Sequence, residues 1–316
     1  MGNRMFVPDA RADYRPLVNC AQMATAAKGV QAFRTYLEMI KFEHSVFALP
    51  FAMVGMVWAS VEFGGTGWPG WRVFLLIVLC MVSARSAAMA YNRIADRDVD
   101  AVNPRTKMRA IPSGLLSLKH ANLFFYGSCI VFFVGAALLN GLTLALSPVA
   151  LFTVLFYSRT KRFTPLSHFV LGLSLGIAPA AAWASVTARL DWPVLLVCLG
   201  VLFWTAGFDI IYSLQDEEFD RANGLRSLPA EIGRAEALNV SRLCHALAIV
   251  CLALACWVLS VGVFAWVGVL VAATVMAFEQ SLVKPDDLSR VNLAFFTLNG
   301  FVSLGFFAFV LLDVLL

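Results

Sequence analysis

The sequence predicts an all-α membrane protein, with nine transmembrane helices in one bundle around a central cavity and a cytoplasmic N-terminus. Of its 316 residues, 60% are hydrophobic and 14% are charged, whereas soluble domains are about 45–50% apolar and about 25% charged. Such a chain cannot cover a water-facing surface with polar groups, and the same composition excludes a disordered chain. Because a membrane helix needs about 20 apolar residues, nine helices leave no room for a large soluble domain.

Nine apolar segments follow one another along the chain. They are continuously apolar without strict alternation, which favours helices over the strands of a barrel. Each is long enough to cross about 30 Å of hydrocarbon as a helix. Pro50, Pro148 and Pro179 fall inside segments, where a membrane helix tolerates proline because neighbouring helices can satisfy the freed carbonyls. The segments are 45–63, 72–94, 120–140, 142–158, 166–188, 192–215, 236–260, 262–283 and 292–315.

The placement of Lys and Arg predicts the orientation. The N-terminal stretch and the connections that follow even-numbered segments hold 21 of the 24 Lys and Arg residues. Cytoplasmic loops carry such an excess, so these parts are predicted to be cytoplasmic. Residues 1–34 are predicted to be a polar, partly disordered extension and residues 35–316 the nine-helix domain. A short amphipathic helix is expected over 31–42, at the membrane interface.

Two polar motifs with the same spacing follow the second and sixth segments: Asn92, Asp96 and Asp100, then Tyr212, Asp216 and Asp220. On a helix, residues four apart share one face, with Cβ atoms about 6 Å apart. Two carboxylates at that distance repel by about 3 kcal/mol at an effective dielectric constant near 20. Beside a bilayer, such a pair keeps its charge more easily by binding a divalent cation. Mg²⁺ suits oxygen ligands and takes one or two carboxylates plus substrate phosphates.

The two motifs therefore predict two metal positions flanking one diphosphate. An acidic cluster at a helix end with no partner is the alternative, but it would have to occur twice at the same spacing. Asp209 shares the face of the second motif, two turns deeper. The acids off these faces, Asp98, Glu217 and Glu218, are expected to be solvated.

Basic residues lie beside both motifs: Arg105, Arg109, Lys161, Arg162 and Arg226. Arg side chains match phosphate oxygens in a bidentate geometry. The alternative is that these bases only anchor the cytoplasmic loops. Their position beside two acidic motifs favours a role in binding diphosphate for the first four, and less so for Arg226.

Arg85 lies inside the second segment, seven residues before Asn92, and so shares its face two turns deeper. An intramembrane Arg faces a cavity or a partner. Arg85 is expected either to pair with Asp209 or to bind an anionic group of a substrate, with snorkelling to the interface as a third alternative. His120, His168 and His245 are isolated in the sequence and show no metal-ligand spacing.

In this order, the motifs resemble those of the UbiA family of intramembrane prenyltransferases. The match runs from about residue 35 to the end of the chain, and residues 84–93 look most like the 4-hydroxybenzoate polyprenyltransferase group and its menaquinone-pathway relatives. The residues that carry the resemblance are Asn92-xxx-Asp96-xxx-Asp100, Arg105-Thr-xx-Arg109-xx-Pro-Ser-Gly, Tyr157-xxx-Lys161-Arg162 and Asp209-xx-Tyr212-xxx-Asp216-xxx-Asp220.

The resemblance implies Mg²⁺-dependent transfer of a polyprenyl group from polyprenyl diphosphate to the ring of an aromatic acid. The acceptor would be 4-hydroxybenzoate in ubiquinone-type quinone biosynthesis, or alternatively a dihydroxynaphthoate in menaquinone biosynthesis. An apolar chamber that opens sideways to membrane lipid would hold the chain and keep water from the allylic cation. The resemblance places the enzyme in a bacterial-type inner (cytoplasmic) membrane with its active site toward the cytoplasm, and no nucleic-acid partner is expected.

The resemblance also assigns roles to residues. Two Mg²⁺ ions would be held by the pairs Asp96/Asp100 and Asp216/Asp220, with Asn92 completing the first site. Four bases would neutralise the leaving diphosphate, with Arg105 and Lys161 in the catalytic set. Asp209 or Tyr212 would position the acceptor or the second metal. The remaining substrate-binding residues would be Arg109, Arg162, Tyr157 and Arg85.

An ion-coupled membrane transporter is the competing function, because ionisable groups in membranes often mark ion pathways. Two features disfavour it. The acids cluster at helix ends rather than at the bilayer midplane, and the segments lack paired Gly/Pro-broken helices at matching positions. A scaffold without a site does not explain a duplicated acidic motif.

Overall fold

The computed structural model describes residues 45–316. The predicted extension over 1–34 and the predicted interfacial helix over 31–42 lie outside this range. Every predicted apolar segment coincides with a helix, and the described residues form no β-sheet. The long helices are α2 (Ser45–Glu62), α3 (Trp71–Ala95), α5 (Leu118–Leu139), α6 (Gly141–Thr160), α7 (Ser167–Thr187), α8 (Trp192–Ser213), α11 (Arg234–Val258), α12 (Val263–Leu282) and α13 (Asn299–Leu315).

Within residues 45–316, eight helices are long and apolar enough to cross a membrane, and α2 adds the shorter apolar stretch Phe47–Glu62. The predicted fold class is therefore confirmed as an all-helical membrane bundle. Short elements join the long helices: α4 (Arg97–Val102), the 3₁₀ turn η2 (Leu214–Asp216), α9 (Glu217–Ala222), α10 (Leu228–Ile232) and the π-helical turn η3 (Leu293–Leu298).

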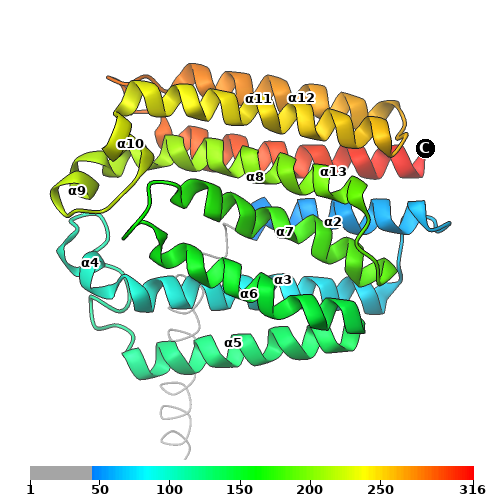
Figure 1. The fold of residues 1–316 in the computed structure, drawn as a ribbon, viewed down its shortest axis with the longest axis horizontal. Coiled ribbons are helices and arrows are strands. Elements are labelled where there is room, and N and C mark those ends of the chain that lie inside the picture. Colours follow the sequence, from blue (N-terminus) through cyan, green and yellow to red (C-terminus); the bar gives the residue numbers. More distant parts are fainter. Residues whose placement is uncertain (1–44) are drawn as a thin grey trace, which may run out of the picture.

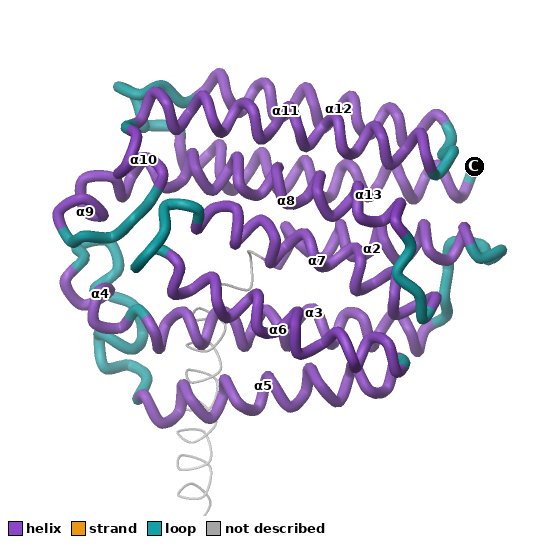
Figure 2. Tube along the Cα trace, viewed as in Figure 1, coloured by secondary structure: helices purple, strands orange, loops and turns teal. Residues whose placement is uncertain are grey.

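The short helices α4, α9 and α10 gather at one end of the bundle, opposite the C-terminus (Figure 1). Loops are confined to the two ends of the long helices (Figure 2). Both acidic motifs follow helices that reach the end marked by α4 and α9, so one end of the bundle carries both motifs.

The helices pack in two groups. On one side, α8 lies against α7 and α11, while α2 lies against α7 and α13; on the other side, α3 lies against α5 and α6. Small residues permit the closest crossings, as is usual between membrane helices. A Cβ atom at Gly172 of α7 would collide with the Leu202 carbonyl oxygen of α8. The main core fills the first group and includes the fully buried rings of Phe51, Trp204 and Phe306.

Candidate active site

One cavity of about 630 Å³ runs between the two groups of helices. Its walls come from α2, α3, α5, α6, α7 and α8, and its mouth lies among the loops that follow α3, α6 and α8. All thirteen site residues predicted from the sequence line it: Arg85, Asn92, Asp96, Asp100, Arg105, Arg109, Tyr157, Lys161, Arg162, Asp209, Tyr212, Asp216 and Asp220.

Both acidic motifs contain the same break in the helix. α3 ends immediately before Asp96, and the η2 turn ends at Asp216. The two residues have nearly the same backbone angles, φ −97°, ψ 5° for Asp96 and φ −99°, ψ 0° for Asp216. These angles lie in the bridge region, where many active-site residues are found. Neither motif therefore lies on one continuous helix. The Asp100 N–H still donates to the Asp96 carbonyl at 2.7 Å.

Each of the four motif carboxylates is paired with one of the four predicted bases. The Arg105 guanidinium forms a bidentate pair with Asp216 at 3.1 and 2.7 Å. The remaining pairs are Arg109–Asp100 at 2.7 Å, Lys161–Asp220 at 3.2 Å and Arg162–Asp96 at 3.4 Å. Three of these pairs join different loops, so the acids and bases hold the mouth of the cavity together.

Asn92 and Asp96 interact directly within the first motif. The Asn92 amide Nδ2 donates to Asp96 at 2.9 Å, and its oxygen accepts from Arg93 at 3.4 Å. Burial raises the pKa of the Asp96 carboxyl above its usual value, and the nearby Asp100 charge raises it further, while Arg162 opposes both effects. A cation bound in place of Arg162 would therefore favour the charged form of the Asp96 carboxylate.

The donors at the mouth fit a hard divalent cation. The motif residues that line the cavity offer carboxylate oxygens and one amide oxygen, the ligands that Mg²⁺ prefers. Within residues 45–316, no group of three or more His, Cys, Asp or Glu is arranged to hold a metal ion by itself.

Residues 48–305 match the UbiA prenyltransferase family. The chain is 30% identical over 266 residues to the 4-hydroxybenzoate octaprenyltransferase of Vibrio campbellii, which covers 84% of this chain and 93% of that protein. It is also 30% identical over 281 residues to the enzyme of the same name from Vibrio cholerae (strain O395), covering 89% and 98%. The chain belongs to the UbiA prenyltransferase family. The predicted enzyme class, an aromatic prenyltransferase, is confirmed by this family and these named relatives.

Solved structures of the family have the same fold. The apo structure of a UbiA homologue from Aeropyrum pernix K1 has a TM-score of 0.77 and 35% identity, covering 86% of this chain and 98% of that one. A UbiA homologue from Archaeoglobus fulgidus bound to GPP and Mg²⁺ has a TM-score of 0.69 and 19% identity, covering 89% and 100%. The chain is accordingly an integral membrane protein, as predicted.

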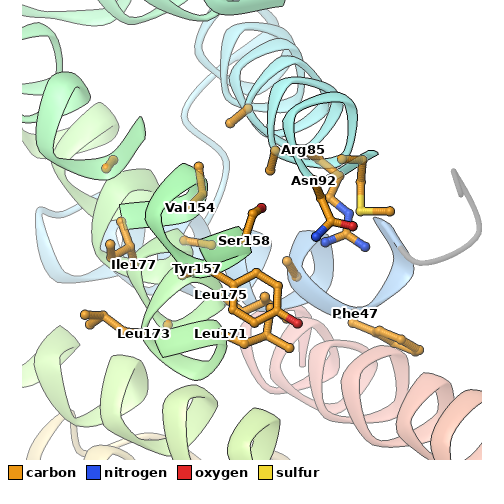
Figure 3. A pocket seen from close by; sticks show the side chains of 18 of the residues that line it. Phe47, Arg85, Asn92, Val154, Tyr157, Ser158, Leu171, Leu173, Leu175 and Ile177 are labelled. Atoms are coloured by element: carbon orange, nitrogen blue, oxygen red, sulfur yellow. The ribbon is translucent and has the colours of Figure 1, made fainter. Parts of the chain in front are cut away.

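Deeper in this UbiA cavity, Arg85 and Asn92 project from α3 toward the same space as the Tyr157 ring of α6 (Figure 3). The Arg85 Nε atom is buried and has no hydrogen-bond partner among the residues that the structure describes. One of the alternatives for Arg85, an ion pair with Asp209, is wrong: the described partner of Asp209 is His168, at 2.6 Å. Arg85 and Asp209 line the same cavity but form no ion pair with each other.

His168 does not line the cavity but contacts Asp209, which does, and the sequence analysis missed this contact. It lies 41 positions before Asp209 and carries no spacing signal. Only the packing of α7 against α8 brings the two side chains together.

An aromatic wall borders the second motif. Tyr212 stacks on Phe295 with ring centroids 4.1 Å apart, and its hydroxyl accepts a hydrogen bond from Arg105 at 3.4 Å. The fully buried Asn299 holds the adjacent π-helical turn, because its amide donates to the Ala294 and Phe295 carbonyls and to Glu279. This buried cluster was not predicted either.

Two polar residues have surroundings that differ from the sequence analysis. Glu217 was expected to be solvated, but it is buried and paired with Arg221 and Arg234. Arg226 does not line the cavity; its backbone N–H donates to the Lys161 carbonyl at 2.7 Å, and its side chain pairs with Glu231. Arg226 thus fastens one loop at the mouth to another.

The inner part of the cavity is apolar and reaches the side of the bundle. Val149 of α6 and Leu173 of α7 line it and are also 62% and 45% exposed. Leu139 and Leu190 line its far end, close to the opposite end of the helices. The cavity therefore combines a charged mouth with an apolar interior that has openings toward the lipid-facing surface.

Proposed function

We propose that this chain transfers a polyprenyl group from polyprenyl diphosphate to the ring of an aromatic acid, with Mg²⁺ as cofactor and 4-hydroxybenzoate as acceptor, in ubiquinone-type quinone biosynthesis. The observation that carries the proposal is the one-to-one pairing of four acids with four bases at the mouth of an apolar cavity. Such a mouth fits a metal diphosphate, and such an interior fits its hydrocarbon chain.

Asp96 and Asp100, completed by Asn92, would hold one Mg²⁺ ion, and Asp216 and Asp220 would hold a second. When bound, the metal neutralises charge that develops on the leaving diphosphate. The GPP and Mg²⁺ bound to the Archaeoglobus fulgidus homologue support this cofactor.

The four bases bind the diphosphate. On donor binding, each of these bases exchanges its carboxylate partner for phosphate oxygens, to which an Arg can donate two hydrogen bonds in a bidentate geometry. The bases are Arg105, Arg109, Lys161 and Arg162. The cost of separating each ion pair is offset because acid and base each gain a partner of opposite charge. As the bond between the donor C1 and the diphosphate oxygen breaks, these fixed cations stabilise the leaving group.

The acceptor occupies the space between Arg85 and Tyr157. A guanidinium whose buried Nε has no partner among the described residues is suited to the carboxylate of an aromatic acid. The electron-rich ring attacks C1 of the allylic donor, a carbon–carbon bond forms, and the ring then loses a proton. Apolar walls keep water from the reactive carbon during this step.

We also propose the setting of the reaction. Most Lys and Arg residues lie in the N-terminal stretch and in the connections that follow even-numbered segments, which supports a cytoplasmic cavity mouth in a bacterial-type inner membrane. Residues 35–316 would form the prenyltransferase domain. The donor chain lies in the lipid-accessible part of the cavity, so a membrane-borne substrate enters without crossing water.

The test is an assay of membrane fractions with Mg²⁺, a polyprenyl diphosphate and 4-hydroxybenzoate, with products identified by mass. A prenylated hydroxybenzoate that disappears when EDTA is added supports both the class and the acceptor. A product formed only with a dihydroxynaphthoate retains the mechanism but changes the acceptor. No product with any aromatic acid, together with solute uptake by reconstituted vesicles, supports the transporter instead.

A further inference from the structure

Asp209 differs from the other carboxylates of the cavity. It lies seven residues before Asp216, which places it about 10 Å deeper along α8. Five carboxylates line the cavity within residues 45–316, and four of them have an Arg or Lys within 4 Å. The fifth, Asp209, is paired with a histidine instead.

The histidine holds Asp209 in one orientation. His168 is fully buried, and its Nδ1 lies 2.6 Å from Asp209 Oδ2. Its other nitrogen, Nε2, accepts a hydrogen bond from the Leu228 backbone N–H at 3.3 Å. Because Nε2 acts as an acceptor there, the ring is neutral and its one proton sits on Nδ1, from which it is donated to Asp209.

This arrangement leaves the second oxygen of Asp209 available. Oδ1 has no hydrogen-bond partner in the part of the chain that the structure describes, and the side chain is 13% exposed, on the cavity wall. Asp209 also lines the same cavity as Arg85 and Tyr157, the two residues that border the space assigned to the acceptor. A carboxylate oxygen without a partner thus faces the acceptor's part of the cavity.

The reaction proposed above needs a base at this depth. After the ring attacks C1, one ring carbon carries both the new prenyl group and its original hydrogen. Aromaticity returns when that C–H bond breaks, its electron pair stays in the ring and the proton passes to a base. The carboxylates at the mouth are committed to cations, which leaves them poorly placed to accept it.

We propose that Asp209 is the catalytic base that takes the ring proton on Oδ1, and that His168 is the positioning residue that aims it. The donor C1–O electron pair leaves with the diphosphate, the carbon–carbon bond forms, and the proton transferred to Asp209 passes to water at the mouth when product leaves. This inference rests on the proposed function, because it requires an aromatic acceptor.

The test compares 4-hydroxybenzoate with the same acid deuterated at the ring positions next to the hydroxyl. We expect ionisation of the donor to limit turnover in the wild type, in which case both acceptors react at the same rate. Asp209→Asn should lower kcat by about 10²–10⁴-fold, the usual contribution of a general base, and should reveal a primary isotope effect, with the KM for the donor unchanged. The matched variant Asp216→Asn should also lower turnover, but without an isotope effect.

His168 has its own matched pair of variants. His168→Gln retains an N–H that can donate to Asp209, whereas His168→Leu does not. The Leu variant should lower kcat and show the isotope effect, and the Gln variant should recover most of the loss. A merely structural role would instead lower thermal stability without revealing the isotope effect.

The outcomes separate this inference from the function on which it rests. Wild-type turnover with near-normal rates for Asp209→Asn, or reduced rates without an isotope effect, overturns the assignment of Asp209 and keeps the prenyltransferase. No prenylated aromatic product from the wild type with any acceptor overturns both. If His168→Leu fails to fold, the Asp209→Asn result decides alone.

Discussion

Arg105 and Asp216 form a bidentate ion pair although 111 residues separate them in the chain. Arg105 follows the first acidic motif and Asp216 belongs to the second, so the pair joins the two sides of the cavity mouth. Lys161 makes a similar link from the α6–α7 connection to Asp220. In the absence of substrate, the same groups that would bind a metal diphosphate neutralise one another, which keeps a charged mouth stable beside the bilayer.

Replacing one motif carboxylate should remove turnover without unfolding the protein. Asp216→Asn or Asp96→Asn keeps the shape of the side chain but removes its charge, and we expect kcat to fall by at least about 10²-fold, as when one group that stabilises a leaving charge is lost. Product formation measures activity, and thermal unfolding in detergent checks the fold. Near-normal turnover in both variants would remove the metal-binding assignment.

Mg²⁺ and diphosphate should stabilise the protein together far more than separately. Each ligand alone has to break ion pairs and leaves either the bases or the acids without partners, whereas the two together satisfy both sets. At ligand concentrations about 100 times the dissociation constant, binding adds about 2.7 kcal/mol to the unfolding free energy. Thermal shifts with Mg²⁺, inorganic diphosphate and both should therefore be non-additive, and equal shifts for the separate and joint additions would contradict the exchange.

Arg85→Ala should weaken acceptor binding more than donor binding. Arg85 lies two turns deeper than Asn92 and away from the paired bases at the mouth. A hydrogen bond to a charged group contributes about 1.5–3 kcal/mol, which corresponds to about a 10- to 100-fold increase in the KM of an aromatic acid. The methyl ester of the same acid, which lacks the carboxylate charge, serves as a matched substrate and should lose much less. Equal changes for donor and acceptor would remove this role.

The order of the helices and the residues of the site were predictable because they depend on local pattern. Apolar runs of membrane length predicted the helices. The spacing of four residues between Asn92, Asp96 and Asp100 predicted the helix face and the depth at which they lie. The side chains that contact one another were not predictable in the same way. The pair Asp209–His168 depends on how α7 crosses α8, and Glu217 is buried by Arg234, which begins a helix farther along the chain.

The break in each motif was also invisible in the sequence. No Pro or Gly interrupts the residues around Asp96 or Asp216, so local pattern predicts a continuous helix there. The structure instead places both residues in the bridge region, where each long helix gives way to a short one. The same departure at both motifs indicates that it belongs to the site.

Asn299→Leu should destabilise the bundle and disturb the second motif. Asn299 is fully buried, accepts from Trp204 Nε1 at 2.6 Å and donates to Glu279 at 3.0 Å. Each buried polar group left without its partner costs about 1–3 kcal/mol of unfolding free energy. The π-helical turn that carries Phe295 would loosen too, and with it the ring stacked on Tyr212. Glu279→Gln keeps an acceptor for Asn299 and is the matched control. Denaturant unfolding in detergent should therefore show a much larger loss of unfolding free energy for Asn299→Leu than for Glu279→Gln. Equal losses would contradict the role of Asn299 in holding the π-helical turn.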